Sequence, residues 1–225
     1  MRDLSTAMQD YIKAIFMLGQ QGSVGTNDLA RHLNVSAASV TSMVKKLSDL
    51  NLVRHQAYQG AELTISGRKV ALELIRHHRL IETYLAEALG YAWHEVHEEA
   101  ERLEHHISEA FEEKIDALLG HPRYDPHGDP IPAKDGRMPP TWADRLCDAP
   151  DGSTVVLRRV SDHDATMLQY LHHHGLLLAT TVRITDRMDN GDLTVQVGRR
   201  RVAVPLQMAR HMFVEHDPDE GRRHS

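Results

Sequence analysis

Four side chains of types that bind metal ions lie close together between residues 97 and 105. If this segment is helical, they follow one another at i, i+4, i+7 and i+8 and share one face: His97, Glu101, Glu104 and His105. An amphipathic helix ordinarily carries leucines on such a stripe, whereas imidazoles and carboxylates are ligands of divalent metal ions. The pattern indicates a metal site, and the alternative is a solvated acidic helix face.

A second histidine–glutamate pair at helical spacing, His78 and Glu82, precedes this segment. One such pair alone is most simply a solvated surface feature. The metal hypothesis gains weight from the region upstream, where the elements that would position these residues follow the order of a DNA-binding domain.

The elements before and around these residues are predicted from apolar spacing and from turn residues. Helical periodicity and caps predict helices over residues 4–21, 27–33, 37–50, 66–89 and 93–119. Thr26 and Ser36 are the candidate N-caps of the second and third helices. Two extended runs, 52–56 and 61–65, flank a glycine turn at residues 58–60 and predict a β-hairpin.

The last third of the chain has a different pattern. Residues 120–152 are rich in Gly, Pro and Asp and predict a linker or an ordered loop. Short strands are expected in the region that follows, at 153–160, 177–185, 193–197 and 201–204, with a small helix at 164–174. Four or five short strands in so few residues favour a small β-barrel.

Composition and charge agree with a cytoplasmic DNA-binding protein. The chain has 225 residues, a net charge of −6 and one cysteine, Cys147, so an internal disulfide is impossible. Residues 1–70 carry eight Lys/Arg against five Asp/Glu, while residues 71–140 carry seven against fifteen. A basic start and an acidic middle fit a DNA reader joined to a cation-binding segment. No apolar run approaches the length of a membrane span, and no signal peptide is expected.

The order short helix, turn, longer helix and hairpin is that of a winged helix-turn-helix, whose second helix enters the major groove. The base-facing positions would be small residues at the start of that helix: Ser36, Ala37, Ala38, Ser39, Thr41 and Ser42. Basic residues nearby are candidates for phosphate contacts: Arg31, Lys45, Lys46 and Arg54. The alternative is a generic three-helix core whose basic residues are only solvated.

With these patterns together, the chain resembles the DtxR/MntR family of metal-dependent transcriptional regulators over nearly its whole length. The resemblance rests on short motifs in a fixed order: Asp3-Leu4, Tyr11, Ser39-Val40-Thr41, Leu63-Thr64, Gly67, His78-Arg79-Leu80, Val96 to Ala100, Glu104-His105 and Gly128 to Pro132. The residues that follow resemble the SH3-like domain of the longer members.

The resemblance implies two metal sites per subunit. The regulatory site would consist of Asp10, Glu101, Glu104 and His105. The ancillary site would consist of His78, Glu82, His97 and a ligand from the SH3-like domain, aligned as Asp164 with Asp162 and His163 as rivals.

Two departures from other members concern the metal. Iron-type members carry methionine and cysteine where this chain has Asp10 and Glu101, and oxygen ligands favour Mn²⁺ over softer ions. Short manganese-type members carry a glutamate where this chain has Lys13, and that glutamate helps to bridge two ions. A protonated lysine cannot be a ligand, so we expect two separated sites.

The expected fold is α+β. It comprises a winged helix-turn-helix at 1–70, a helical metal-binding and dimerisation domain at 71–140, a linker at 141–152, an SH3-like small β-barrel at 153–216 and a flexible tail at 217–225. The expected function is that of a Mn²⁺-dependent regulator, by default a repressor of metal-uptake genes, which binds a palindromic operator as a homodimer and is not an enzyme.

Three alternatives remain at this point. The first is an Fe²⁺-dependent regulator of the same family. The second is a winged-helix regulator that senses a small organic ligand and uses the His/Glu stripes only as salt bridges. The third is a metal hydrolase, which would need an open coordination position and a general base.

Overall fold

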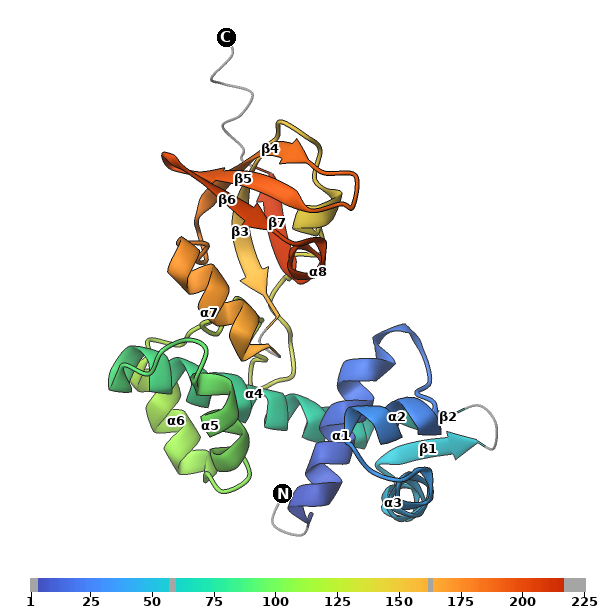
Figure 1. The fold of residues 1–225 in the computed structure, drawn as a ribbon. Helices are drawn as coiled ribbons and strands as arrows, with labels where there is room; N and C mark the ends of the chain where they lie inside the picture. The colour runs from blue at the N-terminus through green and yellow to red at the C-terminus, as the bar shows by residue number, and fades with distance from the viewer. Residues whose placement is uncertain (1–3, 57–59, 162–163, 217–225) are drawn as a thin grey trace. The chain divides into compact units, whose positions relative to one another are not determined.

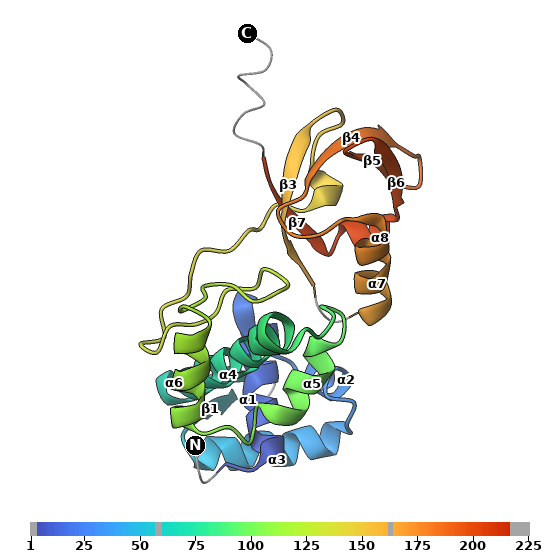
Figure 2. The same ribbon diagram turned by 90° about the vertical axis from the view of Figure 1, so that its left-hand side faces the viewer.

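We describe residues 4–56, 60–161 and 164–216 in a computed structural model of the chain (Figures 1 and 2). Predictions on Asp3, on the wing turn at 58–59, on Asp162 and His163 and on the tail 217–225 lie outside the described residues. The chain forms two compact units. The first comprises Met1–His78, Glu101–Lys114 and Pro132–Met138, and the second comprises Arg79–Ala100, Ile115–Ile131 and Pro139–Ser225.

The first unit begins with the predicted helix-turn-helix. It contains α1 (Thr6–Leu18), a 3₁₀ turn (Gly19–Gln21), α2 (Thr26–His32) and α3 (Ala37–Asp49). Ser36 caps α3 as predicted, because its extended backbone lets its hydroxyl accept a hydrogen bond from Ser39 N at 3.1 Å.

The predicted cap of α2 was wrong by one residue. The carbonyl of Gly25 accepts the first helical hydrogen bonds, from Asp28 N and Leu29 N, so Gly25 is the cap and Thr26 is already helical.

The wing follows as an antiparallel hairpin of β1 (Val53–Gln56) and β2 (Gly60–Leu63), with Val53 opposite Leu63. The long helix α4 (Ile65–Leu89) starts close against it. A Cβ on Gly67 would lie 2.0 Å from the carbonyl oxygen of Leu52, so only glycine allows this approach. The core of this part is apolar and comes from all its elements: Ile12, Ile15, Leu29, Val40, Val44, Leu47, Val53, Ala61 and Leu72.

The helix predicted over residues 93–119 is wrong. Two helices replace it, α5 (Val96–Leu103) and α6 (Glu109–Leu118). Between them His106 N bonds back to the carbonyl of Leu103, and the Ser108 hydroxyl accepts a hydrogen bond from Phe111 N, which starts α6 anew. Glu104 and His105 therefore lie in a turn after α5 rather than on a continuous helical stripe.

The second unit contains a five-stranded antiparallel sheet in the order β6-β5-β4-β3-β7. The strands are β3 (Thr154–Val160), β4 (Thr181–Arg187), β5 (Leu193–Val197), β6 (Arg200–Val204) and β7 (Met212–His216). The sequence ranges missed β7 and the short α8 (Leu206–Ala209) that precedes it. Register shifts in β3 and β4 accompany the curl of the sheet seen in Figure 2.

Helix α7 (Ala165–His174), predicted from the sequence, joins β3 to β4 and contributes to the core of this sheet domain. The core side chains are apolar and come from the strands and α7: Val155, Leu157, Leu168, Leu171, Val182, Ile184, Val195, Val202 and Val214. Trp93, from the turn before α5, packs against the same core. Within the described residues, no helix is both long and apolar enough to cross a membrane.

A buried ion network joins α4 to α6 in the first unit. Arg76 Nε donates to Glu112 Oε1 at 2.6 Å, Arg76 also donates to the carbonyl of Pro132 at 2.9 Å, and His77 Nε2 lies 3.0 Å from Glu112 Oε2. Burial by itself would raise the pKa of Glu112, but the hydrogen bonds from His77 and Arg76 outweigh it and lower the pKa to about 2.

We predict that Glu112→Gln lowers the free energy of unfolding by about 3 kcal/mol at pH 7, because it leaves Arg76 buried without its counter-ion. The carboxyl has a lower pKa folded than unfolded, so its contribution is complete above about pH 4.5 and is lost as the pH falls towards 2. Urea unfolding followed by circular dichroism at pH 7 and pH 3 measures both effects. The control Glu113→Gln removes an exposed ion pair with Lys134 and should change stability by less than about 0.5 kcal/mol. Equal losses in the two variants would contradict the assignment.

Candidate metal centres

Three of the four residues predicted for the regulatory site converge in the first unit. Asp10 lies on α1, while Glu104 and His105 come from the turn after α5. His105 Nε2 is 3.1 Å from Asp10 Oδ1 and 3.5 Å from Glu104 Oε1. One ligand atom from each residue lies within 4.8 Å of the others, so the three could hold one cation between α1 and the α5–α6 turn.

Gln9 orients the imidazole of His105. Its amide nitrogen donates to the carbonyl of Leu4 at 3.1 Å, so its amide oxygen is left to accept from His105 Nδ1 at 2.8 Å. With the hydrogen on Nδ1, His105 presents Nε2 to Asp10, and a metal ligand needs this arrangement. Sequence analysis did not identify Gln9, and a buried glutamine beside Asp10 gives no periodic signal.

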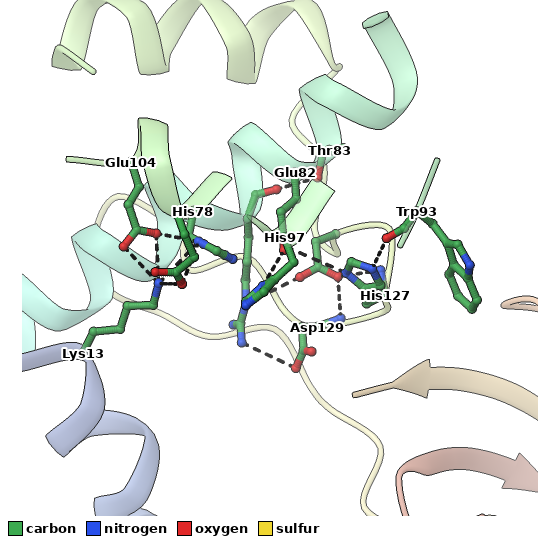
Figure 3. A network of polar contacts seen from close by, with 12 residues as sticks. Lys13, His78, Glu82, Thr83, Trp93, His97, Glu104, His127 and Asp129 are labelled. Atoms are coloured by element: carbon green, nitrogen blue, oxygen red, sulfur yellow. Dashed lines mark hydrogen bonds and ion pairs between the residues drawn. The ribbon is translucent and has the colours of Figure 1, made fainter. Parts of the chain in front are cut away.

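The fourth predicted residue, Glu101, forms an ion pair with Lys13, whose neighbours His78 and Glu104 are seen in Figure 3. Lys13 Nζ donates to Glu101 Oε1 at 2.6 Å and to both carboxylate oxygens of Glu104 at 2.9 Å, and it lies 3.3 Å from His78 Nδ1. The same His78 nitrogen is 2.5 Å from Glu104 Oε2. Glu104 is therefore shared between the Lys13 ammonium on one side and Asp10 with His105 on the other.

The charges of this centre depend on one another. Burial would lower the pKa of Lys13, but Glu104 and Glu101 outweigh it and raise the pKa. Burial would likewise raise the pKa of Glu104, but His78 and Lys13 outweigh it and lower the pKa. Burial raises the pKa of Asp10, and among the described residues no lysine forms a hydrogen bond with it. The centre thus holds a charged lysine–glutamate core with Asp10 at its edge.

A second centre lies in the second unit, and its Glu82 and His127 are labelled in Figure 3. Its three residues, Glu82, Asp125 and His127, are buried. Glu82 on α4 and Asp125 and His127 in the loop after α6 bring one ligand atom each within 4.8 Å of the others. Glu82 Oε1 is 3.2 Å from His97 Nδ1, and Glu82 Oε2 is 3.9 Å from His127 Nδ1. Arg79 Nε is 3.6 Å from Asp125 Oδ2.

The donor atoms of this centre are suited to a cation. His127 Nδ1 and Asp125 Oδ2 are buried and accept no hydrogen bond from the described residues. Burial, with Glu82 and Asp129 close by, raises the pKa of Asp125 well above its ordinary value. Two carboxylates and an imidazole in a dry site are costly unless a proton or a cation is added.

Of the predicted ancillary set, Glu82 Oε1 lies 3.2 Å from His97 Nδ1, and His78 Nδ1 contacts Glu104. Asp164 caps α7, and its Oδ1 accepts from Thr166 N and Met167 N at 2.9 and 3.1 Å.

Asp125 and His127, which sequence analysis did not single out, lie beside Glu82 and could hold a metal ion with it. The signal for them was the run Asp125-Pro126-His127-Gly128-Asp129, which concentrates ligand types in a loop.

All ten residues predicted to face DNA are exposed. They lie on α2, at the start and along the outer face of α3, and on β1: Arg31, Ser36, Ala37, Ala38, Ser39, Thr41, Ser42, Lys45, Lys46 and Arg54. Val40, Val44 and Leu47 of the same helix are buried, so α3 presents one polar face to solvent. A winged helix-turn-helix with such an exposed polar helix face is the arrangement of a DNA-binding protein.

Known proteins share this arrangement. Three family models match the chain. The iron dependent repressor N-terminal DNA binding domain matches residues 3–61, and the iron dependent repressor metal binding and dimerisation domain matches residues 64–133. The FeoA domain matches residues 145–216. The iron-dependent repressor IdeR of Mycobacterium bovis is 31% identical over 228 residues, covering 96% of this chain and 99% of the relative. The regulator MntR of Geobacillus kaustophilus is 35% identical over 103 residues, covering 45% and 72%.

Solved structures that resemble this chain are also metal-dependent repressors. A manganese-dependent transcriptional repressor in complex with manganese superposes with a TM-score of 0.86 at 38% identity, covering 93% of this chain and all of that one. ScaR with bound Cd²⁺ superposes with a TM-score of 0.80 at 34% identity, covering 93% and 99%. The chain therefore belongs to the DtxR/MntR family of metal-dependent transcriptional repressors, which confirms the resemblance, the fold class and the general function inferred from sequence.

We predict that Lys13→Met destabilises the metal-free protein and enlarges its response to Mn²⁺. Without the ammonium, Glu101 and Glu104 face each other uncompensated, a loss on the order of 2 kcal/mol, and they attract a divalent cation more strongly. Thermal unfolding with EDTA and with Mn²⁺ should show a lower melting temperature in EDTA and a larger rise with Mn²⁺. Lys114→Met, at an exposed position of α6, is the control and should match the wild type. A Mn²⁺-induced rise no larger than that of the wild type would contradict this role of Lys13.

Proposed function

We propose that this protein is a Mn²⁺-activated repressor of metal-uptake genes that binds a palindromic operator as a homodimer. The observation that carries the proposal is the convergence of Asp10, on the first helix of the DNA-binding module, with Glu104 and His105 from the α5–α6 turn. A cation at this point neutralises the carboxylates and ties α1 to that turn.

The choice of metal follows from the donor atoms. Both centres offer carboxylate oxygens and imidazole nitrogens, and neither includes a thioether or thiolate sulfur; Cys147 lies in the 3₁₀ turn before β3. Such donors suit Mn²⁺ better than softer ions, although affinity alone does not set selectivity. Fe²⁺ is the second candidate, because relatives named iron-dependent repressors cover nearly the whole chain.

We assign the regulatory site to Asp10, Glu101, Glu104 and His105. Within the part of the chain that the structure describes, no lysine forms a hydrogen bond with Asp10 or His105, whereas Lys13 and His105 both contact Glu104. Lys13 supplies one positive charge against three carboxylates, so the group retains a charge near −2, which matches one divalent ion. This balance supports a single ion here rather than a bridged pair.

For the second site we propose Glu82 and His97 of the predicted set together with Asp125 and His127. His78 is better placed for the regulatory centre, where its Nδ1 meets Glu104. Asp164 can join the second site only by giving up its cap of α7, which costs about 1 kcal/mol.

The conformational effect of the metal follows from these contacts. In the metal-free protein, the carboxylates that converge on α1 repel one another. If the ion binds the DNA-competent arrangement of α1 more tightly, it raises the population of that arrangement, and operator DNA raises metal affinity by the same factor.

Dimerisation is supported by the family model over residues 64–133, which describes a metal binding and dimerisation domain. The helices of this region also expose large apolar side chains, among them Leu89, Leu103, Phe111 and Leu118. Exposed apolar side chains are suited to contact between two copies of the chain. A symmetric dimer of winged helices would read two half-sites, hence the palindrome.

We predict that Asp10→Ala keeps the fold and loses metal-dependent operator binding. Mobility shift on a palindromic promoter fragment in EDTA, Mn²⁺, anaerobic Fe²⁺ and Zn²⁺ measures this. The wild type should shift with Mn²⁺ and not with EDTA, and the variant should need at least about tenfold more protein. Asp189→Ala, in the exposed β4–β5 turn, should behave as wild type. Equal wild-type binding in EDTA would favour the organic-ligand alternative, and an unchanged Asp10→Ala response would refute the regulatory site.

A further prediction concerns α3. Lys45→Ala should weaken operator and random-sequence DNA alike and reduce the slope of log affinity against log salt by about 1, because Lys45 is exposed beside the recognition surface and suited to a phosphate. Fluorescence anisotropy at several salt concentrations measures the slope. A loss confined to the operator would show that Lys45 reads a base instead.

A further inference from the structure

Trp93 connects the second metal centre to the sheet domain. It lies in the turn before α5, and its indole Nε1 donates to the carbonyl of Leu168 on α7 at 3.1 Å. Its own carbonyl oxygen is 2.7 Å from His127 Nε2 (Figure 3). The rings of Trp93 and His127 stack, with centroids 5.8 Å apart and an interplanar angle of 28°. One residue therefore contacts both α7 and a candidate ligand.

The contact with the Trp93 carbonyl decides which nitrogen of His127 can bind a metal. A carbonyl oxygen only accepts hydrogen bonds, so the hydrogen of His127 must be on Nε2. Nδ1 is then the nitrogen that faces Glu82 and Asp125 in the centre. If the imidazole ring were flipped, its Nε2–H would point away from the Trp93 carbonyl. The centre would then lack the imidazole nitrogen that binds the metal.

The backbone of His127 is fixed from the sheet domain as well. The Val160 N–H of β3 donates to the His127 carbonyl at 2.9 Å. The next residue, Gly128, has φ +86°, and a Cβ there would lie 2.1 Å from the carbonyl oxygen of Arg158. The loop can approach β3 this closely only with glycine at that position. The remaining freedom of His127 is rotation of its ring, which the Trp93 carbonyl and indole restrict.

We propose that Trp93 is a positioning residue through which the sheet domain sets the metal affinity of the second centre. This inference rests on the proposed second site. It adds that α7 acts on that site through Trp93, without itself supplying a ligand. Because linkage is reciprocal, metal binding strengthens the contact between Trp93 and α7 by the same factor by which that contact strengthens metal binding.

The experiment uses the full-length protein with Asp10→Ala, which leaves the second centre as the measured site. Mn²⁺ binding is followed by electron paramagnetic resonance of free Mn²⁺. We expect Trp93→Phe, which removes the indole N–H but keeps an aromatic ring, to weaken binding about tenfold. The matched control is Tyr170→Phe, which removes another hydrogen bond from α7, to the Ala203 carbonyl, and should leave the affinity unchanged.

A spectroscopic measurement keeps Trp93 intact. The chain has two tryptophans, so Trp142→Phe leaves Trp93 as the single indole. Mn²⁺ at the second centre should quench its emission in proportion to site occupancy, and His127→Gln should abolish the quenching. Because the rings of Trp93 and His127 stack, this quenching locates the bound Mn²⁺ beside His127, while the affinity of Trp93→Phe tests the positioning role.

The outcomes separate the inference from the site on which it rests. Tenfold weaker binding in Trp93→Phe alone, with saturable quenching of Trp93, supports the proposal. Unchanged affinity in Trp93→Phe, or equal weakening in Tyr170→Phe, overturns it while the second site stands. No saturable binding in the Asp10→Ala protein, or binding that survives Glu82→Gln, overturns the second site and the inference with it.

Discussion

The structure depends on how buried carboxylates are neutralised. The middle of the chain is strongly acidic, and several of its acids are taken out of water, where an uncompensated carboxylate is costly. Glu112 is satisfied by Arg76 and His77, and Glu104 by Lys13 and His78. Each of these contacts joins segments far apart in sequence, so the same charges that demand compensation also hold α1, α4 and the turns around α5 and α6 together.

The two centres differ in how far their own side chains neutralise the buried carboxylates. In the first, Lys13 neutralises Glu101 and Glu104, and the remaining charge is concentrated at Asp10 near His105. In the second, Arg79 approaches Asp125 only to 3.6 Å, and the pKa of that carboxyl rises well above its ordinary value. A site whose charge is not balanced by its own side chains is suited to respond to an external cation. Both centres fit a protein whose DNA-binding state depends on metal.

Metal binding also requires that each imidazole present the correct nitrogen. Residues outside the ligand sets provide this orientation. Gln9 fixes His105 so that Nε2 faces Asp10, and the Trp93 carbonyl fixes His127 so that Nδ1 faces Glu82. Neither contact could be anticipated from residue types, because each residue acts here through a single polar atom that no spacing pattern reveals. The family resemblance likewise carried over ligands but not the groups that aim them.

The sequence by itself determined the winged helix-turn-helix, the ligand types and the α+β fold class, because apolar spacing, caps such as Ser36 and the motif order are local properties of the chain. It failed where long-range contacts override local periodicity. Residues 93–119 read as one helix, yet the chain breaks at Glu104, whose carboxylate is held by Lys13 and His78. Only the tertiary structure shows that His78 contacts Glu104, that Asp125 and His127 lie beside Glu82 and that Asp164 caps α7. Burial and hydrogen-bond partners, which local sequence does not reveal, decide which of many carboxylates and imidazoles meet.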